Sequence, residues 1–239
     1  MQRTFTQPAD RAIAFAGLEN RLAKAFYTDA HYGIIGKFLH RNLLWLRPID
    51  ASLTRTRPNS GDSQQELAPS WSWMGYEGSI KFMLIDFESV AWSDVVQFRN
   101  SKELECRVRE FRDCNMVREG DEFVLLGVGS SDERSDESSE GSNDARSDDE
   151  SVEDVDSVKL PKARSWLRFD VDASNFGSIK CVIIGRNFGY YSNQYEKDCY
   201  VIIVKSSSSG DGIFDRVGVG SIDSRFISLD EPGIRASIV

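Results

Sequence analysis

The chain has 239 residues, of which 40% are hydrophobic and 11% aromatic, a composition typical of a globular protein with a substantial core. Its net charge of −9 comes from one tract, residues 130–157, which holds twelve acidic residues and two arginines. That leaves 26 of the 38 acids and 27 of the 29 basic residues elsewhere, so the rest is nearly neutral and lacks the basic footprint of a nucleic-acid-binding protein.

The sequence also bears on location and redox state. It contains no run of 18 apolar residues, so no transmembrane helix is indicated. Its first residues, MQRTFTQPAD, lack the apolar segment of a signal peptide, and we expect a cytoplasmic protein with no membrane partner. We expect the cysteines, which show no Cys-x-x-Cys spacing, to be reduced and packed as inert apolar groups: Cys106, Cys114, Cys181 and Cys199.

Two helices are predicted in a helical segment at residues 1–48. In the first, PADRAIAFAGLENRLAKAFY, four apolar residues share one face at helical spacing: Phe15, Leu18, Leu22 and Phe26. In the second, HYGIIGKFLHRNLLWL, a similar stripe precedes Pro48: Ile35, Leu39, Leu43 and Leu46. Residues 49–69 are rich in Ser, Pro, Asn and Gly and are predicted to form a loop.

From residue 70 onward, short apolar or alternating runs predict a β domain in two parts, residues 70–129 and 158–239. The predicted strands are Ser70–Trp73, Ser79–Phe87, Val95–Phe98, Glu103–Phe111, Glu122–Gly127, Trp166–Val171, Ile179–Arg186, Cys199–Lys205 and Phe214–Ile222. Charged residues alternate with apolar ones in Glu103–Phe111, which indicates a strand with one solvent-facing side. The unbroken runs CVIIG and CYVIIV are typical of central strands covered on both faces.

Because helical patterns do not alternate with these strands, we expect mostly antiparallel pairing. The predicted fold class is therefore α+β, with two N-terminal helices packed on a mostly antiparallel β-sandwich or barrel. The acidic tract at residues 130–157 is expected to be a long disordered surface insertion, since it cannot bury enough apolar surface to offset its ordering entropy. Either it is only a solvated loop, or it is a regulated interaction tail. Three of its serines have an acid three residues on and are candidate phosphorylation sites: Ser130, Ser147 and Ser151.

Four segments, in chain order, resemble one fungal family. They are Thr4–Leu22 (TFTQPADRAIAFAGLENRL), Gly33–Trp45 (GIIGKFLHRNLLW), Ala68–Trp73 (APSWSW) and Cys199–Ile222 (CYVIIVKSSSSGDGIFDRVGVGSI). They are similar to the region that follows the HET domain in heterokaryon-incompatibility proteins, with its Leu-Leu-Trp and Arg-Val-Gly-x-Gly stretches. Ile35 stands where the family usually has Trp after Gly-Leu.

The HET domain precedes these motifs in the family, so the resemblance implies none of that domain's own activity for this chain. It implies an association with nonself recognition and programmed cell death, through contacts with a protein partner. It also implies that an upstream HET domain could belong to a longer chain.

The segment Ala68–Trp73 is the structural family motif, formed by Ala68, Pro69, Ser70, Trp71, Ser72 and Trp73. If SWSW is a strand, both indoles lie on the same face. One interpretation is that they anchor the helices to the sheet; the other is that they form a stacking platform for a sugar or a base. The loop FGYYSNQY offers a further candidate ligand-binding set: Tyr190, Tyr191, Asn193 and Tyr195.

Signals for catalysis are weak, and we predict no catalytic residues, no metal and no cofactor. His31 and His40, the only histidines, would face opposite sides of a single helix. The sequence lacks a nucleophile elbow, an H-E-x-x-H motif and a phosphate-binding P-loop. The adjacent residues Asp215 and Arg216 suggest an exposed ion pair at a turn.

Taken together, these features predict a non-enzymatic accessory or regulatory module that acts through protein contacts. The alternative is a β domain that binds a small ligand or a carbohydrate through loop aromatics.

Overall fold

The computed structural model describes residues 10–56, 67–128, 164–171, 178–188 and 198–239. Two sets of predicted residues lie outside this part of the chain. One is the acidic tract at residues 130–157 with Ser130, Ser147 and Ser151; the other is the loop set Tyr190, Tyr191, Asn193 and Tyr195.

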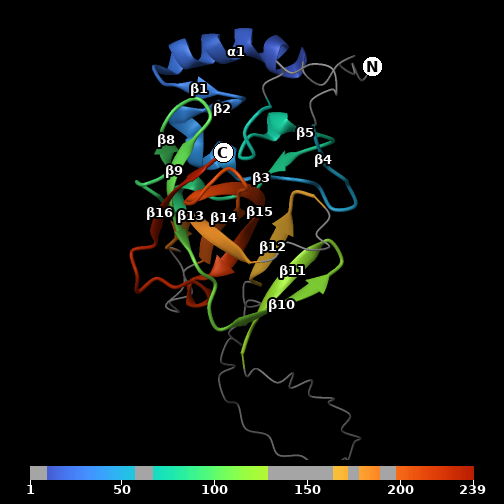
Figure 1. Ribbon diagram of the computed structural model, residues 1–239, viewed down its shortest axis with the longest axis vertical. Helices are drawn as coiled ribbons and strands as arrows, with labels where there is room; N and C mark the ends of the chain where they lie inside the picture. Colours follow the sequence, from blue (N-terminus) through green and yellow to red (C-terminus); the bar gives the residue numbers. More distant parts are fainter. Residues whose placement is uncertain (1–9, 57–66, 129–163, 172–177, 189–197) are drawn as a thin grey trace, which may run out of the picture.

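The first predicted helix is confirmed as α1 (Asp10–Phe26), which lies across the top of the molecule in Figure 1. It rests on a small hairpin made of β1 (Ala30–His31) and β2 (Ile34–Ile35). Phe15 contacts Trp73 edge to face, with ring centroids 5.6 Å apart. Leu18 is 38% exposed, so the buried face of the helix is narrower than the predicted stripe.

The second predicted helix is wrong for most of its length. The β1–β2 hairpin occupies its start, a 3-10 turn follows at Gly36–Phe38, and only α2 (Leu39–Leu43) is α-helical before β3 (Trp45–Leu46). Gly33 explains the difference, because its φ of +80° makes the hairpin turn and a Cβ there would stand 2.7 Å from the Trp73 indole. The four residues of the predicted stripe are nevertheless buried: Ile35, Leu39, Leu43 and Leu46.

Five strands form a closed ring at the centre of the molecule: β9 (Leu104–Arg109), β13 (Ile179–Asn187), β14 (Asp198–Ser206), β15 (Ile213–Asp223) and β16 (Ile234–Ile238). Each strand pairs with the next in that order, and β16 returns to β9. A ring with an odd number of strands cannot alternate direction throughout, and β15–β16 is its one parallel pair. Of the two predicted alternatives, a mostly antiparallel β-sandwich or a barrel, the structure shows the barrel.

A second layer extends from β15 as β12 (Trp166–Phe169), β11 (Glu122–Gly127) and β10 (Cys114–Glu119), which lie low in Figure 1. Strands β13 and β14 therefore separate two cores. Val182 and Ile202 face the barrel interior, whereas Cys181 and Val201 face the core shared with the second layer. This double burial confirms that the CVIIG and CYVIIV runs are central strands.

Short strands complete the fold. They are β4 (Thr54–Arg55) paired with β5 (Tyr76–Glu77), β6 (Lys81–Phe82) paired with β3, β7 (Val90–Trp92) paired with β13, and β8 (Gln97–Phe98) paired with β9. Strand β4 lies inside the region predicted as a loop, and β10 and β16 were not predicted at all. Of the predicted strand Ser79–Phe87 only β6 is paired as a strand. Its predicted end is instead a 3-10 turn, Phe87–Ser89, which the Asp86 side chain caps by accepting a hydrogen bond from the backbone nitrogen of Glu88.

The segment Ser70–Trp73 is not the predicted strand. It is a turn that runs into a second 3-10 helix, Trp73–Gly75. The Ser72 hydroxyl accepts a hydrogen bond from the backbone nitrogen of Met74 at 3.0 Å and caps this helix, so the backbone has a local alternative to a strand. Within the described parts of the chain, no helix has the length and apolarity needed to cross a membrane.

Candidate binding groove around Trp92

The two tryptophans of the motif have different surroundings. Trp71 is completely buried, contacts Tyr32 and Phe98, and donates a 3.1 Å hydrogen bond from its indole nitrogen to the carbonyl of Lys102. Trp73 is half-buried and joins α1 to the barrel core. Both are anchors, and the burial of Trp71 rules it out as a stacking platform.

The polar residues of the motif are satisfied inside the molecule. Ser70 donates to the carbonyl of Val239 on the barrel side and accepts a 2.8 Å hydrogen bond from the backbone nitrogen of Arg216. Ser72 donates to the carbonyl of Tyr32 in the β1–β2 hairpin at 2.7 Å. The motif therefore connects the helical layer to two barrel strands through buried hydrogen bonds.

Arg216 is the centre of a fully buried ionic cluster and not the exposed partner of Asp215. Its guanidinium contacts both carboxylate oxygens of Asp170, at 3.0 and 3.2 Å, and donates to the carbonyls of Leu43 and Trp45. It also lies 3.5 Å from the centroid of the Trp45 ring. The expected turn pair was wrong because Arg216 lies within β15 and projects inward, where only a cluster of acceptors makes its burial tolerable.

Burial raises the pKa of the Asp170 carboxyl, and Arg216 opposes that shift. Burial likewise raises the pKa of Tyr76, which lies beside this cluster and beneath the guanidinium of Arg55. The cluster connects segments that are far apart in the sequence, namely Gly33–Trp45, Ala68–Trp73 and Cys199–Ile222. Three of the four segments that carry the family resemblance therefore meet at one structural centre.

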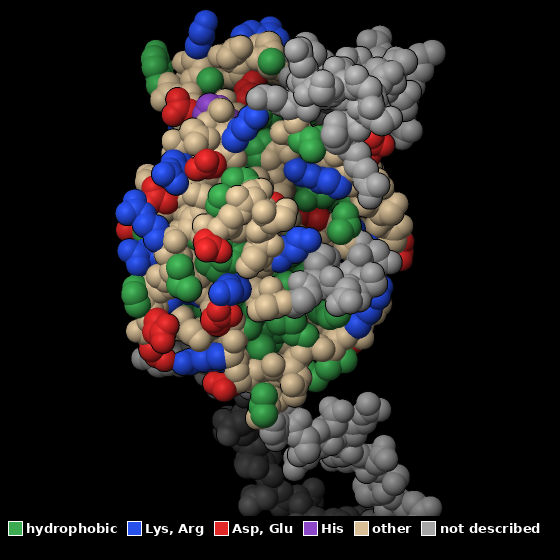
Figure 2. Space-filling model, viewed as in Figure 1, with side chains coloured by type: hydrophobic (Ala, Val, Ile, Leu, Met, Phe, Trp, Pro, Cys, Tyr) green, Lys and Arg blue, Asp and Glu red, His purple; other side chains and the backbone are tan. Residues whose placement is uncertain are grey.

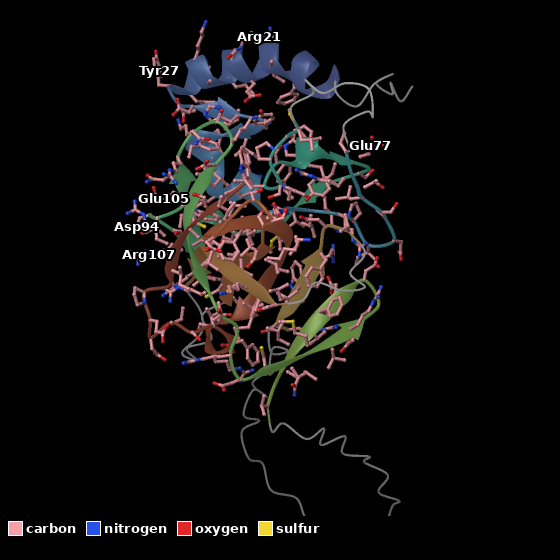
Figure 3. All side chains as sticks on the ribbon, in the orientation of Figure 1. Arg21, Tyr27, Glu77, Asp94, Glu105 and Arg107 are labelled. Carbon is pink, nitrogen blue, oxygen red and sulfur yellow. The ribbon has the colours of Figure 1, made fainter. Side chains whose placement is uncertain are left out.

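A group of three arginines lines a hollow elsewhere in the molecule, beside β7, β9 and β13. A hollow of about 440 Å³ is lined by Ala91, Trp92, Ser93, Asp94, Val95, Arg107, Arg109, Ile183, Arg186 and Pro232. We call it the arginine groove. Arg107 and Asp94 lie on the same flank of the molecule, away from Arg21 on α1 (Figure 3).

The three arginines of the groove are held in different ways. Arg109 is half-buried and donates to the carbonyls of Ser228 and Glu231, so it also fixes the turn before β16. Arg107 is exposed and donates to the carbonyl of Pro232 at 3.1 Å. Arg186 is exposed near the end of β13. Only the carboxylate of Asp94 faces these three cations in the lining.

A bulge in β13 places the aromatic wall of the groove. The pairing register shifts between Ile183 and Gly185, and Gly185 pairs with Trp92. A Cβ on Gly185 would lie 2.6 Å from Val90 and 2.9 Å from the Trp92 ring. Glycine at this position therefore permits the close approach of Val90 and Trp92 to β13.

Trp92 also lines a second hollow of about 240 Å³, together with Lys37, Phe38, His40 and Arg41. His40 stacks against the Trp92 ring at 5.8 Å and hydrogen-bonds the carbonyl of Ser93 at 2.6 Å through its Nε2 atom. Burial lowers the pKa of His40. Phe38 in the second hollow is 40% exposed, and Trp92 is the residue that lines both hollows.

Sequence reasoning did not identify this surface. Its one visible signal was the alternation in Glu103–Phe111, which put Arg107 and Arg109 on one face of β9. Trp92 and Arg186 had no such signal, since the groove depends on the pairing of both β7 and β9 with β13. The two histidines lie on separate elements, His31 on β1 and His40 on α2, and not on one helix.

All four cysteines are free thiols, as expected, and burial raises the pKa of each. The pKa rises to about 12 for Cys106 and to about 11 for Cys199, so these thiols are protonated and unreactive at neutral pH.

The described residues hold no cluster of three or more His, Cys, Asp or Glu side chains placed to bind a metal. Comparisons with protein-family models, curated proteins and solved structures found no match.

Proposed function

We propose that this chain is a non-enzymatic accessory or regulatory module that acts through protein contacts, and that the arginine groove is its contact surface. The observation that carries the proposal is the grouping of Arg107, Arg109 and Arg186 around one hollow with Trp92 as its wall. Aromatic and arginine side chains are the residues that contribute most to protein interfaces.

The scaffold supports this role. Arg107 and Arg109 project from β9, and Arg186 projects from β13, so all three begin on paired strands of the closed ring. Side chains on such strands are held more precisely than side chains on loops, which reduces the entropy lost when a partner binds. Trp92 lines both the arginine groove and the second hollow with Lys37 and Arg41, so a peptide segment is long enough to contact both, whereas a compact ligand would contact one.

The proposed setting is the one that the sequence resemblance implies, nonself recognition and cell-death signalling in fungi. Ser70, Trp71 and Arg216 are buried and stabilise the fold, which is consistent with this setting. In this proposal the motif segments form the scaffold, and residues on the surface determine which partner binds.

The test is a fusion of the chain to a HET domain, expressed in fungal cells, with cell death as the readout. The double variant Arg107→Glu/Arg186→Glu reverses the charge of the groove and is expected to abolish any change in death signalling that the wild-type chain causes. The matched control is Arg21→Glu/Lys24→Glu, which makes the same charge change on the exposed side of α1 and should behave as wild type. If the wild-type chain changes nothing, or if both double variants behave alike, the proposal fails.

A further inference from the structure

The charge of the arginine groove specifies the charge of its ligand. Three guanidinium groups and one carboxylate line the hollow, so the lining carries two net positive charges. A ligand with a single carboxylate would offset one of them. A phosphate monoester carries about −1.5 to −2 at pH 7 and offsets both.

The donors also match a phosphate in kind. Each guanidinium presents a planar fork of N–H groups, which binds phosphate oxygens in pairs and with more directionality than a lysine ammonium. Arg109 is held by two carbonyls, and Arg107 by one, so both are partly ordered before a ligand arrives. The neighbouring acid Glu105 does not compete for Arg107, because it forms an ion pair with Arg235.

The remaining walls are apolar. Trp92, Ile183 and Pro232 flank the arginines, and the hollow of about 440 Å³ is large enough for a phosphorylated side chain and part of its backbone. Acidic and basic side chains are intermixed over the face shown in Figure 2. The groove lining itself has only three arginines and one acid, which is less than the broad basic area that a nucleic acid or an anionic bilayer would need.

We propose that the arginine groove binds a phosphorylated serine or threonine in a segment of a partner protein. Arg107 and Arg186 contact the phosphate, Arg109 orients the site, and Trp92 packs on the peptide. The second hollow, with Lys37 and Arg41, takes an acidic residue next to the phosphorylated one. This inference rests on the proposed function and adds the chemistry of the partner.

The experiment measures binding of the purified full chain to fluorescent peptide libraries that are degenerate around one fixed position. That position is phosphoserine in the first library, serine in the second and glutamate in the third. We expect binding to the phosphoserine library alone, weakened by salt because the contact is between charges. Arg107→Gln and Arg186→Gln should each weaken it about tenfold or more, since each removes charge-assisted hydrogen bonds. Arg21→Gln, on α1, is the matched control and should bind as wild type.

Three results would overturn the inference: equal binding of the serine or glutamate library, no loss in the two groove variants, or competition by inorganic phosphate as strong as by the peptide. Stronger binding to phosphoinositide vesicles than to peptides would also overturn it, by assigning the site to a membrane lipid. Because the cell-death test uses charge reversal and no phosphopeptide, failure here alongside a positive result there would refute the ligand class and leave the proposed function intact.

Discussion

Replacing either member of the Arg216–Asp170 pair should destabilise the protein severely. The side chain of Arg216 is 0% exposed and that of Asp170 is 2% exposed, so removing one charge leaves the other in an environment without water. Asp170→Asn keeps the shape of the side chain but leaves the guanidinium without its counter-charge. Breaking a buried pair in this way costs about 3–5 kcal/mol of unfolding free energy, and we expect a loss in that range.

Arg216→Met removes more contacts at once. The carbonyls of Leu43 and Trp45 lose their donor, at about 1–3 kcal/mol for each buried acceptor left unpaired. The Trp45 ring also loses the guanidinium stacked 3.5 Å from its centroid. We expect a total loss of about 3–6 kcal/mol, which is a large part of the 5–15 kcal/mol typical of a folded domain.

The same variant should make stability depend on pH in a defined direction. Burial already raises the pKa of Asp170, and removing Arg216 takes away the charge that opposes that shift. The folded state then binds a proton more tightly than the unfolded state, so stability falls as pH rises from the unfolded Asp pKa, about 3.9, through the raised folded value. The deficit of Arg216→Met relative to wild type should therefore be larger at neutral pH than in weak acid.

Urea denaturation followed by tryptophan fluorescence measures these losses, with circular dichroism as a check that the variants fold. The control is Arg112→Gln, which breaks an ion pair with Asp230 whose side chains are 39% and 79% exposed and should cost no more than about 1 kcal/mol. The reasoning is refuted if Asp170→Asn and Arg216→Met cost as little as this control, or if the deficit of Arg216→Met shrinks as pH rises.

Three further outcomes follow from packing and burial. Trp71→Ala should lower the unfolding free energy by about 3–5 kcal/mol in the same urea assay, since the ring is fully buried; a loss below 1 kcal/mol would contradict its role as an anchor. Gly185→Ala should cost about 1–3 kcal/mol and change the fluorescence of Trp92, whereas Gly127→Ala, with open space at its Cβ, should shift neither signal; equal effects would argue against the close approach. Iodoacetamide should alkylate Cys114 first, because it is the one thiol that is not fully buried, and mass spectrometry showing any other cysteine modified first in the native protein would refute this order.

Local patterns predicted much of the β architecture. The alternation in Glu103–Phe111 and the apolar runs in β13 and β14 identified three of the five barrel strands, because burial on one or both faces restricts the residue types of a strand. The predicted strand Phe214–Ile222 matches a fourth, β15. The first helix was found for the same reason. Strand β16 was missed, since a five-residue strand with exposed residues at its start gives a weak pattern.

The site could not be predicted in the same way, because it depends on pairing over long distances in the chain. Arg107 and Arg186 are 79 residues apart in the sequence. The pairing of β9 with β13 and the bulge in β13 bring them to the same hollow. The charge of Arg216 suggested an exposed position. Its burial depends on acceptors contributed by residues as distant as Leu43 and Asp170, which no local window contains.

Arginine is central to both the buried cluster and the exposed groove, but its surroundings differ between them. Mutations at the two places should therefore have different effects. The guanidinium of Arg216 interacts only with groups inside the protein, so replacing Arg216 should lower the free energy of unfolding. Arg107 and Arg186 are exposed on the same barrel, so their loss should leave stability within about 0.5 kcal/mol of wild type and appear in binding. A groove variant that unfolds the protein as Arg216→Met does would place these arginines in the scaffold and would remove the physical basis for a contact surface at Trp92.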